Sequence, residues 1–417
     1  MRILKLTSSV ESRLMKNRQA QDRAAYRAAE KIVAAVRRRG DMALDEWSRR
    51  LDGLDFRHGG LWVSRREMAA AKKRVSGDLL RAVEHAARNV RRVAEQQMPL
   101  VWSLEVEPGV RVEQIIRPIE SVACYIPGGR FALFSTLVMA VVPAQVAGVE
   151  RIVAVCPKAN DELLATAELL GVKHLARMGG AQAIAALAYG TKRVPRVDKI
   201  IGPGNRFVTA AKQLVSAHCA IDLPAGPTEA IVLARRGHPQ WIAADLLAQA
   251  EHAPDASSYL VTPSARLAKQ VQNEVNMQLK LLPAGNPAHL SCRNTGAILL
   301  TGTWKAAVDF VNRFAPEHLS LPDPSPALLG QIRSAGTIFV GPLSAQPFGD
   351  YASGSNHVLP TGGWARRRGG LSVNDFLKQF TAQTIERSGY RRLGADVQAM
   401  ASAEGLLAHA KAVEVRQ

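Results

Sequence analysis

The stretch "SVACYIPGG", residues 121–129, joins a short apolar run to a turn rich in proline and glycine. Related units follow in "RIVAVC" before Pro157, "HLARM" before "GGAQA", "KIIG" before "PGN" and "CAIDLP" before "AGP". Alanine-rich stretches of helical character separate these units. Short β-branched strands that alternate with helices are typical of βα units around a parallel sheet. The pattern therefore predicts an α/β lobe that begins near residue 120.

The same pattern returns after residue 229 in "AIVLA", "SYLVT", "AILL" and "TIFVG". Residues 20–100 have helical periodicity instead, and the tail from about residue 366 also has helical character. We predict an α/β protein with two Rossmann-like lobes and parallel-rich sheets, one lobe inserted in the other. The predicted parts are an N-terminal arm (1–22), a larger discontinuous lobe (23–119 and 230–365), an inserted lobe (120–229) and a C-terminal tail (366–417).

Composition favours a globular protein with no membrane partner. The chain has 417 residues, of which 47% are hydrophobic and 22% charged. Its longest apolar stretch contains Pro143 and is interrupted by Glu150 and Arg151, so it lacks the roughly 20 apolar residues of a membrane span. The N-terminal residues carry charges throughout and no apolar run, so we expect no signal peptide, and the four cysteines form no CxxC pair. We expect a cytoplasmic protein.

The charge balance is basic, with 54 Lys and Arg against 36 Asp and Glu and a formal net charge of +18. Such a field attracts nucleic acid or small anions. Aromatic residues are only 5% and do not alternate with the basic runs, and no nucleic-acid-binding signature is present. We therefore expect no nucleic-acid partner and interpret the excess as a solvated surface around an anionic ligand.

The glycine-rich loops allow two interpretations. In parallel α/β sheets, ligands gather at the carboxyl ends of strands, and glycine lets backbone N–H groups approach a phosphate. The same loops are also ordinary turns. No GxGxxG motif is present, so the residues alone do not establish a dinucleotide site.

A second stretch, "LLAQAEHAPDA" at residues 246–256, places polar side chains at the end of an apolar helical run. Pro239 suits the first helical position and Pro254 prevents continuation. On such a helix Gln249 and His252 are three apart and share a face. Glutamine is an unusual zinc ligand, so chemistry alone favours Glu251 over Gln249.

Several histidines stand near a carboxylate late in the chain. The pairs are His252 with Glu251, His318 with Glu317, His357 with Asp350, and His409 with Glu404. An imidazole beside a carboxylate serves both general acid–base catalysis and zinc binding. Each pair alone is more typical of a structural role, whereas four such pairs in succession favour a functional one, and spacing does not tell which of them converge.

Long motifs occur in a fixed order: "YIPGGR", "MGGAQAIAALAYGT", "VDKIIGPGN", "LPAGPTEA", "DLLAQAEHAPDA", "APEHLSL", "GDYASGSNHVLPTGG" and "GLSVNDFLKQFT". With these motifs the chain resembles the histidinol dehydrogenases, which complete histidine biosynthesis. The resemblance runs from "VRRRGDMALDEWSRRLDG" to "AEGLLAHAKAV". It implies a homodimer that uses NAD and one zinc ion per subunit to oxidise L-histidinol, through L-histidinaldehyde, to L-histidine.

The resemblance also implies roles for individual residues. The zinc ligands would be Gln249, His252, Asp350 and His409. This set replaces Glu251 by Gln249, and the zinc would position the substrate's imidazole and amino groups.

The catalytic pair would be Glu317, which activates water, and His318, which takes the alcohol proton. Substrate contacts would come from this histidine, the zinc ligands, Thr228 and Glu404, with His357 as a further candidate. NAD would be bound by the inserted lobe through Tyr125, Gln182 and Asn205. The tail would cross to the partner subunit, so that active sites are shared.

Thr228 departs from the family, most of whose members have serine there. The departure leaves open a diverged paralogue that oxidises a related amino or sulfonated alcohol. A third alternative is an inactive enzyme fold kept as a nucleic-acid-binding or scaffold protein, against which the complete set of polar residues argues.

Overall fold

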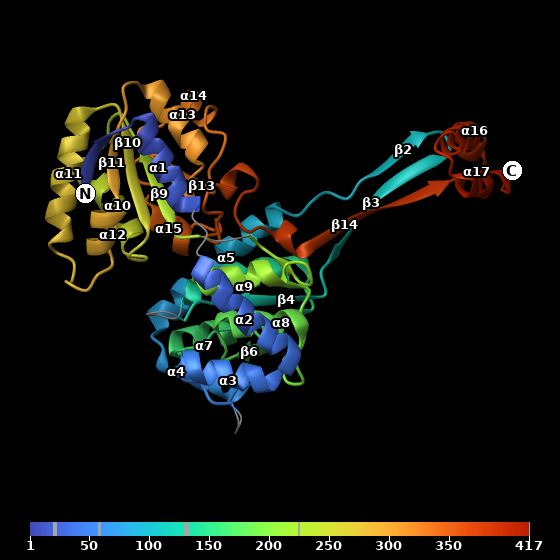
Figure 1. Cartoon of the computed structure of the whole chain (residues 1–417), viewed down its shortest axis with the longest axis horizontal. Coiled ribbons are helices and arrows are strands. Elements are labelled where there is room, and N and C mark those ends of the chain that lie inside the picture. The colour runs from blue at the N-terminus through green and yellow to red at the C-terminus, as the bar shows by residue number, and fades with distance from the viewer. Residues whose placement is uncertain (20–22, 57–59, 129–132, 224–225, 417) are drawn as a thin grey trace.

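The computed structural model describes residues 1–19, 23–56, 60–128, 133–223 and 226–416. The chain forms two α/β lobes and a long arm that leaves the region between them and ends in two helices (Figure 1). The N-terminus lies at the edge of one lobe and the C-terminus at the tip of the arm. The predicted α/β class, with parallel-rich sheets and helices at both ends of the chain, is confirmed.

The six-stranded lobe is built from the first 19 residues and residues 229–365. Every neighbouring strand pair in its sheet is parallel, in the order β1-β11-β10-β9-β12-β13. The strands are β1 (Arg2–Lys5), β9 (Glu229–Leu233), β10 (Ser257–Thr262), β11 (Ala297–Leu300), β12 (His318–Leu321) and β13 (Thr337–Val340).

Helices cover both faces of this sheet because successive strand residues point to opposite sides. On one face, Val232, Leu260 and Ile298 pack against α10 (Pro239–Ala250), α11 (Ala265–Leu279) and α12 (Ala288–Asn294). On the other, Ile231 and Leu319 pack against α13 (Trp304–Phe314), α14 (Pro326–Leu329) and α1 (Ser8–Gln19). The short helix α15 (Gln346–Tyr351) and the turn η1 (Trp364–Arg366) follow the last strand.

The five-stranded lobe, residues 23–96 and 121–221, has the parallel order β6-β5-β4-β7-β8. Its strands are β4 (Ser121–Tyr125), β5 (Arg151–Val155), β6 (His174–Ala176), β7 (Lys199–Ile201) and β8 (Ala220–Ile221). One face packs on α2 (Arg23–Arg39), α3 (Asp41–Asp52), α8 (Gly180–Tyr189) and α9 (Arg206–Val215). The other packs on α4 (Arg65–Arg74), α5 (Gly77–Gln96), α6 (Phe134–Ala147) and α7 (Asp161–Leu169).

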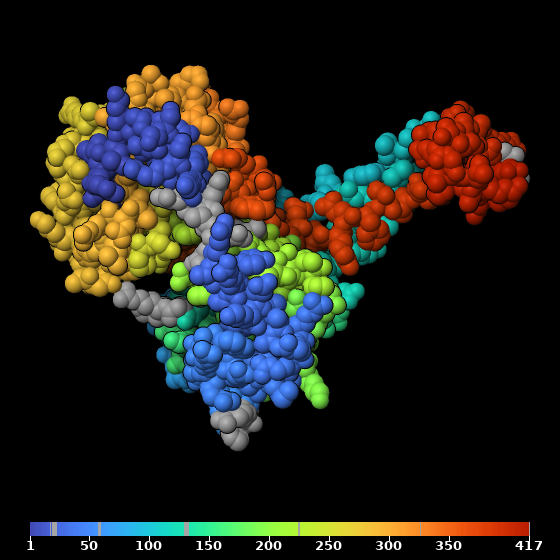
Figure 2. Space-filling view, viewed as in Figure 1, coloured from blue at the N-terminus to red at the C-terminus, as the bar shows by residue number. Residues whose placement is uncertain are grey.

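The arm is a three-stranded antiparallel sheet with a pair of helices at its far end. Its strands, in the order β14-β3-β2, are β2 (Ser103–Glu107), β3 (Val110–Pro118) and β14 (Leu377–Ile385), the last preceded by the turn η2 (Val373–Phe376). The tip consists of α16 (Arg387–Ala403) and α17 (Leu407–Glu414). Figure 2 shows this arm standing clear of both lobes.

The lobe boundaries differ from those predicted. The first residues form no separate arm, because β1 pairs with β11 at the edge of the six-stranded sheet. Residues 23–96 belong to the five-stranded lobe, so the inserted part begins near residue 23 and not at 120. The tail from 366 contains a nine-residue strand as well as helices, and it shares its sheet with residues 103–118.

The physical reason is that an amphipathic helix shows which of its faces is buried but not which sheet it covers. In α2, Ala29, Ile32 and Val36 form an apolar face at helical spacing, and this face packs against α8 and α9. Either lobe would bury the same stripe. The pairing of β1 and of β14 is likewise a long-range choice that short segments do not encode.

None of the helices in the described residues is both long and apolar enough to span a membrane.

Candidate active site

The candidate site lies at one edge of the six-stranded sheet, next to the five-stranded lobe. Thr228 and Glu317 immediately precede β9 and β12, which are parallel neighbours with His318 opposite Ala230. Because parallel neighbours begin at the same edge, the two side chains meet there. This is the amino-terminal edge of the strands, whereas the sequence predicted ligand contacts at carboxyl ends.

A chain of hydrogen bonds joins four side chains at this edge. Gln346 Nε2 donates to Gln249 Oε1 (2.7 Å), and Gln249 Nε2 donates to Thr228 Oγ1 (2.8 Å). Thr228 Oγ1 then donates to Glu317 Oε2 (2.6 Å), which also accepts from the main-chain N–H of Glu229 (2.9 Å). Each partner fixes the next, so the Glu317 carboxyl group has one orientation.

His318 stands beside this chain without a hydrogen bond of its own. Its Nδ1 lies 3.7 Å from Glu317 Oε2 and its Nε2 lies 3.6 Å from Asp350 Oδ1, both beyond hydrogen-bond distance. Both nitrogens are buried without a partner among the described residues, and the ring stacks on Phe339 at a centroid distance of 6.1 Å. A buried imidazole in this state is suited to exchange a proton with a molecule that enters the site.

Burial and charge shift the pKa of both members of the pair. Burial raises the pKa of Glu317, and His318 with the hydrogen bonds from Thr228 and Glu229 offsets only part of this effect. Burial alone would lower the pKa of His318, but the carboxylates of Glu317 and Asp350 outweigh burial and raise it. Neighbouring groups with shifted pKa values in a buried site are typical of acid–base catalysis.

Asp350 and His357 follow β13 and link the two lobes. Burial would raise the pKa of Asp350, but His318, His357 and His252 more than offset it and the carboxyl group ionises more readily than usual. His357 Nδ1 bonds the main-chain oxygen of Asp350 (2.8 Å), and its Nε2 bonds Thr136 Oγ1 on α6 (3.1 Å). Burial lowers the pKa of His357. With both nitrogens engaged, His357 is a structural link in this state of the site.

Gln249, and not Glu251, faces the cluster. Gln249 is fully buried and bonded to Thr228 and Gln346. The exposed Glu251 accepts a hydrogen bond from Asn286 (3.2 Å). Of the two side chains, the structure therefore turns Gln249 toward the site, and the choice of Gln249 as a zinc ligand stays a prediction.

His252 lies in the turn after α10, which begins at Pro239 as predicted but ends at Ala250. The three-residue spacing predicted that His252 shares a helix face with Gln249. This prediction was wrong, because the helix ends before His252. Its Nδ1 instead bonds the main-chain oxygen of Ala248 (3.0 Å). That bond leaves Nε2 for a ligand, the arrangement in which histidines commonly hold a metal.

The donor set at this edge fits three positions of a zinc site. Gln249 Oε1 keeps a second lone pair, Asp350 offers an ionised carboxylate and His252 a ring nitrogen. The nearby carboxyl end of α10 also favours a cation. Within the described ranges no three His, Cys, Asp or Glu side chains group around a metal position, so the amide oxygen and a further donor are required.

The predicted fourth ligand, His409, is not in the cluster of its own chain. His409 lies on α17 and Glu404 caps α16, both exposed at the tip of the arm (Figure 1).

The predicted NAD residues gather at the carboxyl edge of the five-stranded sheet. Tyr125 ends β4 and accepts a hydrogen bond at its hydroxyl from Gly180 N–H (3.1 Å), and burial raises its pKa. Asn205 Oδ1 caps α9. The fully buried Gln182 donates to Asp52 (2.8 Å), while its Oε1 has no partner among the described residues. The orphaned oxygen and the turns around it fit a cofactor with hydroxyl donors, such as a dinucleotide.

Sequence interpretation missed three polar residues that shape the site: Gln346, Arg18 and Glu229. Gln346 orients Gln249, while Arg18 and Glu229 form a buried ion pair behind Glu317. A signal was available for Glu229, because a carboxylate that opens an otherwise apolar strand needs a buried cation.

Two parallel-sheet lobes with a buried glutamate–histidine pair at one sheet edge define an α/β enzyme equipped for acid–base chemistry. The family model described as histidinol dehydrogenase matches residues 15–417. Histidinol dehydrogenase from Methanothermobacter thermautotrophicus is 46% identical over 392 residues, 92% of each chain. That from Halalkalibacterium halodurans is 46% identical over 396 residues, 93% of each chain.

Comparison with solved structures agrees. The crystal structure of histidinol dehydrogenase from Elizabethkingia anophelis matches with a TM-score of 0.92 and 36% identity, covering 100% of this chain and 98% of that one. An acetylating aldehyde dehydrogenase from Geobacillus thermoglucosidasius, with a TM-score of 0.50 and 13% identity, shares the fold alone. The chain belongs to the histidinol dehydrogenase family.

Proposed function

We propose that this enzyme oxidises L-histidinol to L-histidine in two steps, with NAD as the hydride acceptor in each. The observation that carries the proposal is the buried His318, unpartnered beside Glu317, in a member of this family. Each step transfers one hydride to NAD, and the second adds the oxygen of one water molecule. Two proton acceptors are therefore needed at the reacting carbon.

His318 is suited to the first oxidation. The alcohol proton leaves to His318 as the hydride leaves to NAD, and the carboxylates on either side stabilise the imidazolium that forms. Its stacking on Phe339 limits the ring to one plane.

Glu317 is suited to the second oxidation, in which water adds to the aldehyde. The hydrogen bonds from the described residues Thr228 and Glu229 both reach Oε2, which leaves Oε1 to take a proton from water. The raised pKa of Glu317 brings its proton affinity nearer to that needed at neutral pH.

Zinc, when bound, would supply a Lewis-acid template that fixes the imidazole and amino nitrogens of the substrate. Gln249, His252 and Asp350 would hold it. Thr228 would keep the Gln249 amide in place while orienting Glu317, so that the substrate and the catalytic carboxylate share one reference point.

We further propose a homodimer in which the arm completes the partner's site. Several apolar side chains on the arm are exposed, which is unusual for a surface that stays in water: Leu104, Val106, Phe380, Ile385, Met400 and Leu407. His409 of one subunit would then supply the fourth zinc ligand of the other, and Glu404 would meet the substrate's ammonium group. A cytoplasmic location is part of the proposal, since all four cysteines are free and buried.

The test follows NADH formation with L-histidinol in enzyme as purified, after chelation, and after zinc is returned. We expect two NADH per histidine formed, loss of turnover on chelation and recovery with zinc. Full activity in protein proven free of metal would refute the zinc assignment, and absence of turnover with histidinol would refute the substrate.

Thr228 does not require a different substrate. Its hydroxyl accepts from Gln249 and donates to Glu317, contacts that a serine hydroxyl at the same position would also make. A paralogue acting on another amino alcohol would instead turn over that alcohol faster than histidinol in the same assay.

A further inference from the structure

A buried ion pair lies directly behind the Glu317–His318 pair. Arg18, in the last turn of α1, grips the carboxylate of Glu229 with two nitrogens, Nε at 2.9 Å from Oε2 and Nη2 on Oε1. The side chains are only 8% and 3% exposed. Bidentate contacts of this kind fix both direction and distance between the two groups.

The same guanidinium also holds the turn that leads into the catalytic pair. Arg18 Nη1 donates to the main-chain oxygen of Phe314, and Nη2 approaches that of Ala315 at 3.5 Å. The guanidinium carbon, Cζ, of Arg18 lies 3.7 Å above the centre of the Phe314 ring. Among the described residues Ala315 is the one non-glycine residue with positive φ (53°), a conformation that needs support from its surroundings.

Two routes therefore run from Arg18 to Glu317. One follows the main chain from Phe314 through Ala315 and Pro316 to Glu317. The other passes through Glu229, whose main-chain N–H donates to Glu317 Oε2 at 2.9 Å. A shift of Arg18 would move both ends of the contact between Glu229 and Glu317.

Stability alone is a weak explanation for this pair. Burying two charges costs desolvation energy, and apolar residues of similar volume often stabilise a core equally well. Burial raises the pKa of Glu229 to about 7 even though Arg18 opposes the shift, so the ionised carboxylate depends on the guanidinium.

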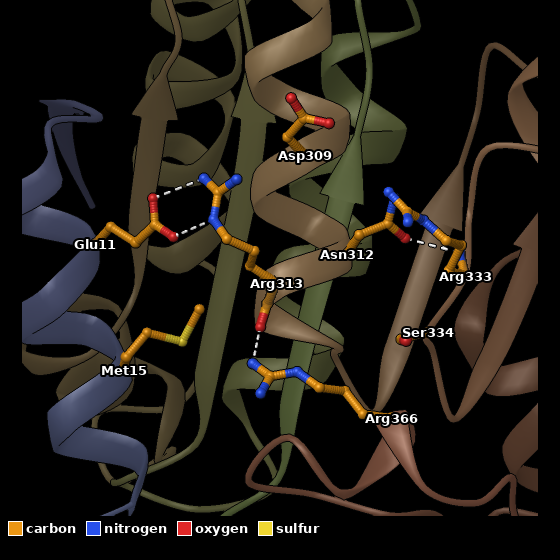
Figure 3. Close-up of a pocket in the computed structure, with 8 residues that line it drawn as sticks. All are labelled: Glu11, Met15, Asp309, Asn312, Arg313, Arg333, Ser334 and Arg366. Atoms are coloured by element: carbon orange, nitrogen blue, oxygen red, sulfur yellow. Dashed lines mark hydrogen bonds and ion pairs between the residues drawn. The ribbon is translucent and has the colours of Figure 1, made fainter.

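A second contact joins the same two helices and provides a comparison. In the surface pocket of about 570 Å³ shown in Figure 3, Arg313 on α13 donates to Glu11 on α1 at 2.6 and 2.9 Å. The Arg313 side chain is 54% exposed, and within the described residues Glu11 has no hydrogen bond or ion pair with residues 228–229 or 314–317. The Glu11–Arg313 pair fastens α1 to α13 without touching the site.

We propose that Arg18 is a positioning residue for the acid–base pair, holding Glu317 through Glu229 and the Phe314–Ala315 turn. The inference rests on the proposed dehydrogenase function. It assigns to the N-terminal helix, which contributes no group to the reacting atoms, the alignment of the group that activates water.

The experiment compares Arg18→Lys and Arg18→Ala with the control Glu11→Gln in full-length enzyme. For Arg18→Ala we expect kcat to fall by about tenfold to a hundredfold with KM for histidinol changed less than about threefold, since misplacement of a catalytic group acts on the chemical step. Arg18→Lys keeps the positive charge but not the bidentate guanidinium geometry, so its kcat should also fall, but by less than that of Arg18→Ala. Glu11→Gln should leave kcat unchanged.

Chemical rescue of kcat separates a positioning role of Arg18 from a merely structural one. Guanidinium ion at low millimolar concentration should restore part of kcat in Arg18→Ala, while sodium at the same ionic strength should not. If Arg18→Ala does not fold, a lowered kcat in Arg18→Lys with native thermal unfolding supports the proposal.

Three results would overturn it: unchanged kcat in a folded Arg18 variant, an equal loss in Glu11→Gln, or rescue by sodium. Failure of the dehydrogenase function itself is distinguishable, because wild-type enzyme would then give no NADH from histidinol.

Discussion

The predicted site has two parts, one at the edge of the six-stranded sheet and one at the tip of the arm. The catalytic pair of the first is buried, and the side chains of the second are exposed. At the sheet edge, Gln249, Glu317 and His318 are buried and positioned by their own chain. At the tip, Glu404 and His409 are exposed, the first at the end of α16 and the second on α17. The difference teaches that this chain buries and positions one part of the predicted site by itself, whereas the other part stays solvated in the single chain.

We expect the largest loss of activity from a substitution in the buried part of the site, at the sheet edge. His318→Gln removes the proton acceptor while keeping a polar side chain of similar size, so kcat should fall by about 10²–10⁴-fold. Zinc content and thermal unfolding should stay close to wild type. A variant that unfolds, or that loses its metal, would make His318 a structural residue and weaken the contrast with the tip.

The next effect tests the exposed part. His409→Asn should lose zinc and at least about a hundredfold in activity without loss of folding, because the side chain is solvated in its own chain. Mixed dimers of this variant with Glu317→Gln, purified after co-expression, should regain about half of wild-type activity, since one of the two sites in each mixed dimer is intact. No recovery in purified mixed dimers would show that each chain supplies both parts.

A smaller effect separates Gln249 from its neighbour Glu251 at the end of α10. Gln249→Ala breaks the contacts to Thr228 and Gln346, and we expect at least a tenfold loss in both kcat and zinc affinity. Glu251→Gln, on the solvent side, should change kcat/KM less than about twofold. Steady-state kinetics and metal analysis of the two variants decide whether the buried side alone carries the site.

The smallest effect is on stability. Burial raises the pKa of Asp245 on α10 to about 6, so the folded state holds a proton that the unfolded state releases near pH 4. The contribution of Asp245 to stability is thus fully present below pH 4 and is lost as pH rises through 6, by at most about 3 kcal/mol. Urea unfolding at several pH values should show this loss relative to Asp245→Asn, whereas parallel curves for the two proteins would place Asp245 in water.

Local signals were sufficient for much of the fold. The apolar runs that end in proline and glycine, such as "SVACYIPGG" and "SYLVT", became strands at the predicted places. β12 was missed because its four residues begin with an ionisable side chain, His318, between two prolines. The arm strands were missed because β3 gains its stability from pairing with β14, more than 250 residues further along the chain.

For the site, residue chemistry located the polar segments but not their convergence. Nothing local distinguishes Gln249, buried against Thr228, from Glu251, which faces solvent two residues later. The resemblance supplied that distinction. Neither source indicated Arg18, because an arginine near the chain start has no visible partner until β9 and α13 are placed beside it.

Strand β1 has a consequence for how the protein is made. Arg2 pairs with Ala297, so the first strand to leave the ribosome waits for a partner strand that begins 295 residues later. At roughly 5–20 residues per second the delay is tens of seconds. All five strands of the other lobe have been made by then, and we expect that lobe to begin folding first while Met1, Ile3 and Leu4 remain open to chaperones and proteases.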